Sequence, residues 1–132
     1  MEKKDIESRE DLLILLNAFY KKVFSDELIG HFFTKVMQVD LETHIPKIAD
    51  FWETVLLNGT SYKDNAIAPH LHINQLSPIE EKHFSRWLKL FGETIDSLFS
   101  GDIAESAKQR ALSITTVMRI KISKSPGIKI LK

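Results

Sequence analysis

The stretch Asn65–Phe91, "NAIAPHLHINQLSPIEEKHFSRWLKLF", joins a histidine-containing apolar segment to the clearest helix start in the chain. Ser77 can cap a helix, Pro78 is tolerated in a first turn because its missing N–H has no partner there, and Glu80 has capping-box spacing. Apolar residues then recur every three or four positions, which predicts a helix running to about residue 99. Its inner face comprises Phe84, Trp87, Leu88, Phe91, Ile95 and Leu98.

The same periodicity marks the first half of the chain. Ser8 followed by Asp11 predicts a helix start and a helix over about 9–24, with a wide apolar face. A second helix is expected over about 43–59, because Pro46 would then fall in its first turn. Both helices are amphipathic, so each must bury one face against the rest of the molecule.

Shorter signals connect these helices. Ser25 as a new cap and Gly30 as a break predict a short helical turn that brings two aromatic side chains inward, Phe32 and Phe33. Asp102 predicts the cap of a last helix, which ends before the tail "SKSPG". No stretch alternates like a strand, so the sequence predicts an all-α fold. We expect a single domain over 1–132 with frayed ends at 1–8 and 123–132.

The overall composition narrows the classes of function. A chain of 132 residues with 43% hydrophobic content can form one core, burying about two thirds of its unfolded surface. Eighteen basic residues balance eighteen acidic ones, so no net field attracts nucleic acid or an anionic membrane. The absence of cysteine excludes disulfides and thiolate sites. The polar N-terminus and the short run "LLILL" indicate neither a signal peptide nor a membrane span, so a cytoplasmic location is expected.

Histidine placement supplies the candidate metal chemistry, because motifs of zinc proteases, phosphate-binding loops and serine hydrolases are absent. His70 follows the apolar run Ala66–Pro69, where it could either pack in the core or bind a ligand. His72 lies two residues on and would point elsewhere unless both histidines clip a metal. Such a clip needs a further imidazole from His83 or His44, so a non-haem site at His70, His72 and His83 remains an alternative.

Three polar-tipped side chains belong to apolar helix faces: Tyr20, His44 and Trp87. Each one alone is explained by core packing with a hydrogen-bonded tip. Together they would need separate internal partners in a small helical core, whereas one shared cavity would satisfy all three. A metal-free helical interaction domain remains the second alternative.

Four segments in order resemble the group III truncated haemoglobins: "FYKKVFSDELIGHFF", "HIPKIADFWETVLL", "YKDNAIAPHL" and "SPIEEKHFSRWLKLF". The resemblance covers nearly the whole chain. It implies a globin-like fold, the truncated two-over-two helical sandwich, around one haem b (iron protoporphyrin IX). It also implies that His70 is the proximal iron ligand, while His72 and His83 do not bind the iron. An imidazole on one side would leave the opposite face of the iron open for ligands.

The resemblance also assigns the distal side of the haem to Tyr20, Trp87 and His44. The hydroxyl and the indole N–H are donors toward bound dioxygen, and His44 is expected to act as a gate. Lys47 is expected near the propionates. The residues expected to contact the haem are Phe32, Phe33, His44, Lys47, Ile48, Phe51, Leu71, Leu76, Phe84, Trp87 and Phe91.

The function implied by the resemblance is binding of dioxygen and other diatomic ligands at a histidine-ligated iron. Nitric oxide, carbon monoxide, cyanide and peroxide are further candidate ligands, and an unidentified reductase is the expected protein partner. A donor-rich pocket also suits oxygen, nitric oxide or peroxide redox chemistry, either dioxygenase-like toward nitric oxide or peroxidase-like. Ligand binding is the expected primary role.

Overall fold

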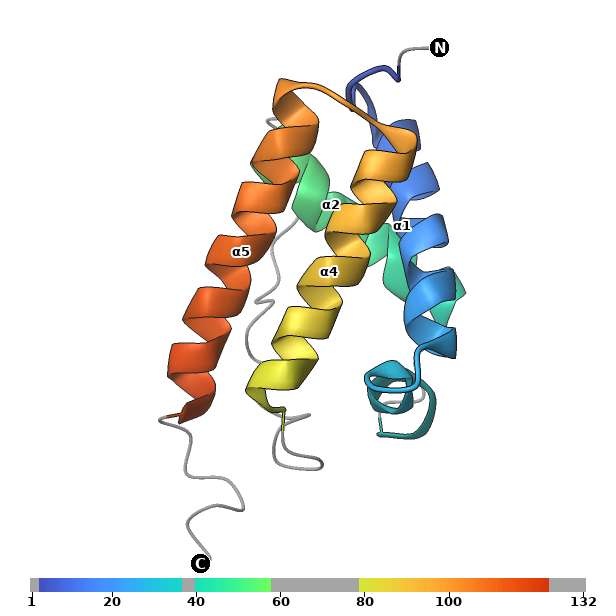
Figure 1. Cartoon of the computed structure of the whole chain (residues 1–132). Helices are drawn as coiled ribbons and strands as arrows, with labels where there is room; N and C mark the ends of the chain where they lie inside the picture. Colours follow the sequence, from blue (N-terminus) through green and yellow to red (C-terminus); the bar gives the residue numbers. More distant parts are fainter. Residues whose placement is uncertain (1–2, 37–39, 58–78, 124–132) are drawn as a thin grey trace, which may run out of the picture.

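The computed structural model describes residues 3–36, 40–57 and 79–123, and within them all regular structure is helical (Figure 1). The predicted all-α fold is confirmed. The elements are α1 (Arg9–Ser25), the π-helical turn η1 (Phe32–Val36), α2 (Leu41–Leu56), α4 (Glu81–Leu98) and α5 (Asp102–Ser123). In these ranges no helix is both long and apolar enough to cross a membrane.

The helices form two packed pairs, α1 with α2 and α4 with α5. In Figure 1, α4 and α5 run side by side in opposite directions, α1 lies beside α4, and α2 crosses behind them. Helix α1 contacts both α2 and α4, and α5 contacts both α4 and α2. Each pair therefore buries its apolar faces against the other, which is the predicted two-over-two sandwich.

Helix α1 carries the central stripe of the core. Its predicted start is confirmed, because the hydroxyl of Ser8 accepts a hydrogen bond from the N–H of Asp11 at 3.3 Å. The apolar residues at helical spacing are fully or almost fully buried: Leu12, Leu15, Leu16, Phe19 and Val23. Burying each of these side chains contributes about 1.5–3 kcal/mol, so the stripe fixes the position of α1.

The turn after α1 differs from its prediction. Asp26 caps it instead of Ser25, because the Asp26 carboxylate accepts from the N–H groups of the residues two and three positions later at 3.0 Å. The hydroxyl of Ser25 donates back to the carbonyl of Lys21 at 2.9 Å. Gly30 does not break the turn. It permits close packing, since an added Cβ would lie 2.9 Å from the carbonyl oxygen of Phe24.

Two helix starts were also predicted at the wrong residue. Helix α2 is capped by Asp40, which accepts from the N–H of Glu42 at 3.1 Å, so Pro46 lies in the second turn and not the first. Helix α4 begins at Glu81, and Glu80 is its extended N-cap residue. The expected cap at Ser77 therefore does not start the helix, and its own position lies outside the described residues.

Residues 3–8 are ordered into the fold, contrary to the expected fraying. The side chain of Ile6 is 1% exposed and belongs to the core. The carboxylate of Asp5 accepts from the N–H groups of Ile103 and Ala104, both at 2.8 Å. The N-terminal segment thus caps α5, a role that the sequence had assigned to the aspartate at the start of α5 itself. The expected fraying of 124–132 lies outside the described residues.

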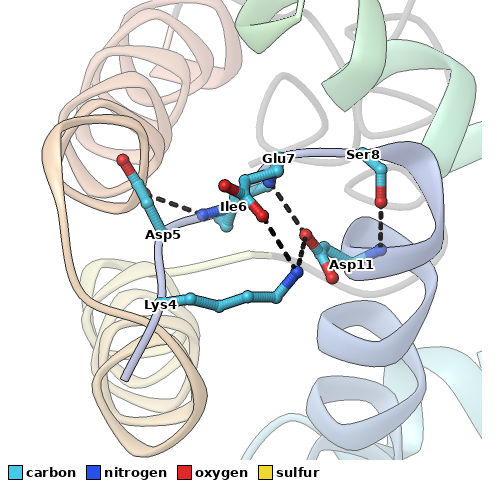
Figure 2. Close-up of polar contacts among 6 residues, drawn as sticks. All are labelled: Lys4, Asp5, Ile6, Glu7, Ser8 and Asp11. Atoms are coloured by element: carbon cyan, nitrogen blue, oxygen red, sulfur yellow. Dashed lines mark hydrogen bonds and ion pairs between the residues drawn. The ribbon is translucent and has the colours of Figure 1, made fainter. Parts of the chain in front are cut away.

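Polar contacts hold the same segment against α1 (Figure 2). The carboxylate of Asp11 accepts from the N–H of Glu7 and from the ammonium of Lys4, both at 2.9 Å. The carbonyl of Lys4 accepts from the N–H of Ser100 at 2.9 Å. The segment therefore joins the start of α1 to the turn between α4 and α5.

The substitution Asp5→Ala tests this non-local cap. It should lower the free energy of unfolding by about 1–2 kcal/mol, because two N–H groups of α5 lose their acceptor. Urea unfolding at neutral pH measures the loss, with Asp102→Ala as the matched control. A larger loss in Asp102→Ala would restore the local cap and contradict the structure.

The contribution of Asp5 should also depend on pH. Burial alone would raise the pKa of Asp5, but hydrogen bonds from the N–H groups of Ile103, Ala104 and Ile6 hold it below its ordinary value. The stabilisation is therefore present above about pH 3.9 and is lost as the pH falls through the lower folded pKa.

Candidate functional site

Helices α1 and α2 bring two of the predicted site residues into contact. The hydroxyl of Tyr20 lies 3.2 Å from Nε2 of His44, and the two rings meet edge to face with their centroids 5.1 Å apart. The hydroxyl donates when Nε2 carries no proton and accepts when it does. Residues separated by 24 positions thus form one polar pair on an otherwise apolar wall.

Burial widens the range of pH over which the phenol of Tyr20 is neutral. Its side chain is 5% exposed, and the loss of hydration raises the pKa of the hydroxyl far above its ordinary value. A neutral phenol retains its O–H at every physiological pH. The site therefore contains a permanent hydrogen-bond donor.

An ion-pair cluster holds the crossing of α1 and α2. Nη1 of Arg9 lies 2.6 Å from the carboxylate of Asp50 and 3.1 Å from that of Glu53. Nη2 of the same guanidinium donates to the carbonyl of Pro46 at 3.2 Å. One α1 side chain thereby binds three groups of α2 and helps to fix how the two helices cross.

Trp87 reaches the polar pair through a shared neighbour. The ring of Phe19 meets Tyr20 edge to face at 5.1 Å and Trp87 at 5.4 Å between centroids. Phe33 adds a further ring 5.8 Å from Tyr20. Tyr20 is therefore in contact with His44 on one side and is linked to Trp87 through Phe19 on the other, and only Tyr20 and His44 touch through polar atoms.

The residues predicted to line a haem occupy several surroundings. Phe32 is buried, Phe91 is 1% exposed, and the side chains of Phe33, Ile48 and Phe51 are partly buried against the main core. Lys47 is exposed on α2. Phe84 belongs to a separate small cluster with Met118, and the guanidinium of Arg119 lies 5.4 Å above its ring. His70, His72, Leu71 and Leu76 lie outside the described residues.

His83 has a structural role that the sequence did not predict. Its Nδ1 accepts the N–H of Glu80 at 2.8 Å, so the imidazole supplies the capping-box acceptor of α4. Burial lowers the pKa of His83, and Lys82 and His31 lower it further against the opposing effect of Glu80. Among the described residues no cluster of three or more candidate ligands could hold a metal. Because Nδ1 of His83 already accepts a hydrogen bond, His83 could bind a metal only through Nε2.

Trp52 lies near the site, although the sequence did not indicate it. Its indole is 4% exposed and stacks on Phe91 with centroids 5.1 Å apart. The available signal was its position on one face of α2 with Ile45 and Ala49, both buried. Periodicity identified that face as apolar, but it cannot tell which ring of a distant helix will stack on it.

The fold is that of a truncated globin. Over 92% of this chain and 96% of the other, the structure superimposes with a TM-score of 0.82 on the crystal structure of the group III truncated haemoglobin from Campylobacter jejuni, at 27% sequence identity. The sequence is also 28% identical over 123 residues to the group 3 truncated haemoglobin ctb of that organism, covering 91% of this chain and 94% of the relative. No protein-family model matches the chain. The predicted resemblance to the group III truncated haemoglobins is confirmed.

Alkaline titration tests the burial of Tyr20. Because its folded pKa is raised, the unfolded state loses the proton above about pH 10 while the folded state keeps it. The free energy of unfolding should therefore fall as the pH rises past that point. Ultraviolet difference spectra and urea unfolding measure the two effects, and Tyr20→Phe should lack this share of the alkaline loss. Ionisation of Tyr20 in its ordinary range without unfolding would contradict its burial.

Proposed function

We propose that this chain is a globin-type haem protein that binds dioxygen or another diatomic ligand, with His70 as the proximal iron ligand. The observation that carries the proposal is the contact of the buried phenol of Tyr20 with the partly buried imidazole of His44, inside a fold similar to the truncated haemoglobins. A buried phenol needs a partner for its polar tip, and here that partner is an imidazole on the facing helix, which places two polar groups together on an apolar wall.

The chemistry of the donor set fits a haem pocket. Haem offers a broad apolar ring, and the partly buried aromatic side chains on η1 and α2 supply an apolar surface of the same kind, Phe33 and Phe51. Tyr20 provides a neutral O–H next to that surface. When bound, haem b would supply an iron that takes diatomic ligands. This chain's residues would set how tightly the ligand is held.

Tyr20 and Trp87 are the proposed distal donors. Dioxygen bound to ferrous iron carries partial negative charge on its outer atom, so an O–H and an indole N–H both stabilise it. Each donor is worth about 1.5–3 kcal/mol toward a charged acceptor. Together they would slow oxygen escape by about two to four powers of ten, which suits retention or reaction better than transport.

The tautomer of His44 controls whether Tyr20 can serve the ligand. When Nε2 carries the proton, the imidazole donates to the phenol oxygen and leaves the O–H of Tyr20 free to point at the ligand. When Nε2 is unprotonated, the phenol donates to His44 instead. We therefore propose that His44 both orients Tyr20 and gates the pocket.

The finer proposals follow from the same pocket. Nitric oxide, carbon monoxide, cyanide and peroxide are proposed as further ligands, and dioxygenase-like or peroxidase-like chemistry would require an unidentified reductase. Lys47, exposed on α2, is proposed to pair with a propionate. We also propose a cytoplasmic location.

The substitution His70→Gly tests the proximal ligand. Purified wild-type protein should show an intense Soret absorption band, and His70→Gly should lose it because the iron loses its protein bond. Added imidazole should restore the band by filling the gap left by the side chain. His72→Gly is the matched control and should keep the band. Equal spectra for His70→Gly and wild-type protein would refute the assignment.

Substitutions of the two donors test the distal side. Tyr20→Phe and Trp87→Phe should each speed dissociation of dioxygen by about one to two powers of ten, since each removes one hydrogen bond. Stopped-flow displacement of oxygen by carbon monoxide measures the rates. Trp52→Phe makes the same change outside the donor set and should leave the rate as in wild-type protein. Unchanged rates in both donor variants would remove the hydrogen-bond argument.

A further inference from the structure

Three aromatic rings form a continuous stack that runs from Trp87 and Phe91 on α4 to Trp52 on α2. The ring of Trp87 lies almost parallel to that of Phe91, with centroids 5.1 Å apart and planes inclined by 15°. Phe91 in turn stacks on Trp52 at 5.1 Å and 25°. Phe91 is 1% exposed and Trp52 is 4% exposed, so the inner part of the stack excludes water.

This order of rings places an oxidisable side chain at each end. Tryptophan is among the side chains that lose an electron most readily, whereas phenylalanine is far harder to oxidise. Face-to-face contact overlaps the π-systems of neighbouring rings, while the edge-on contacts of Phe19 do so much less. Phe91 therefore acts as a bridge between two electron donors.

We propose that the stack of Trp87, Phe91 and Trp52 carries an electron from Trp52 to the iron pocket when hydrogen peroxide is the oxidant. The inference rests on the proposed haem function. Trp52 is then a site of one-electron oxidation within the core. It protects Trp87, which would otherwise be the tryptophan oxidised next to the ligand.

The electrons and atoms balance with peroxide as the only added oxidant. Over a full cycle the O–O bond breaks, and one peroxide takes up two electrons and two solvent protons to give two molecules of water. The indole of Trp52 would supply one of the two electrons and the bound haem the other, which would leave the indole as a radical cation. Two equivalents of a one-electron reductant, of the same class as the proposed reductase, would return both electrons.

Tyr20 is the competing donor, because it too is proposed to face the ligand. It does not belong to the stack, since its phenol contacts Phe19 at an interplanar angle of 63° and Phe19 contacts Trp87 at 89°. Oxidation of a phenol also requires loss of its proton, for which Nε2 of His44 at 3.2 Å is the nearby acceptor. An indole can lose an electron without that proton transfer.

Electron paramagnetic resonance tests the relay in the haem-loaded protein. Samples frozen shortly after mixing with hydrogen peroxide should show an indole radical, whose hyperfine pattern changes when the protein contains ring-deuterated tryptophan. Trp52→Phe should lose most of this signal while keeping the Soret band and the oxygen dissociation rate. Peptide mass spectrometry should locate added oxygen at Trp52 in the wild-type protein.

A substitution that breaks the stack distinguishes electron transfer through Phe91 from direct oxidation of Trp52 by peroxide. Phe91→Leu should shift the added oxygen from Trp52 to Trp87, because the bridge between the two indoles is lost. Phe99→Leu is the matched control, since it removes the buried ring of the C-cap residue of α4, outside the stack, and should leave the oxidation pattern unchanged. Thermal unfolding compares the stability of the two variants.

The outcomes distinguish the two proposals. A wild-type protein without a Soret band would overturn the haem function and the relay with it. A normal Soret band with a tyrosyl radical, or with an indole signal that survives in Trp52→Phe, would overturn the relay alone. Where Trp52→Phe fails to fold, oxidation confined to Trp87 in the wild-type protein gives the same negative answer.

Discussion

The position of Phe19 is the constraint on which both the core and the site depend. Its ring is completely buried and meets Tyr20, Trp87 and Phe91 edge to face at 5.1–5.4 Å. Successive residues of a helix point about 100° apart, so Phe19 faces α4 while Tyr20 faces α2. A shift of α1 that loosened the core would therefore separate the phenol from His44 as well. Packing and donor geometry cannot be changed independently here.

The phenol of Tyr20 is tolerated in this core because it carries no charge. A neutral phenol avoids the desolvation cost of a buried anion, and burial raises its pKa further above the ordinary value. The charged groups that secure the crossing lie further out, where Arg9 binds two α2 carboxylates at the partly exposed rim. Water screens these pairs, so they contribute less energy than the apolar stripe of α1 but fix the relative orientation of the helices.

Periodicity in the sequence predicted the helices and their buried faces, because spacing of three and four residues follows directly from helical geometry. It failed where the partner comes from elsewhere in the chain. The cap of α5 is Asp5, separated from Ile103 by 98 positions, and the capping-box acceptor of α4 is a histidine instead of a glutamate. The site was predictable in part: the resemblance indicated Tyr20, His44 and Trp87, whereas the stacking of Trp52 on Phe91 depends on how α2 crosses α4.

Trp87 has two neighbours that favour different uses of the same indole. Its edge contact with Phe19 links it to Tyr20 and His44. Its stacked face on Phe91 links it to Trp52. Residues 87 and 91 are four positions apart, so they form one ridge of α4 and move together. A pocket that retains dioxygen for long periods also increases exposure to its reduced products, among them peroxide. In the proposed relay, one indole on α4 would both donate a hydrogen bond to the ligand and pass on the electron that arrives from Trp52 through Phe91.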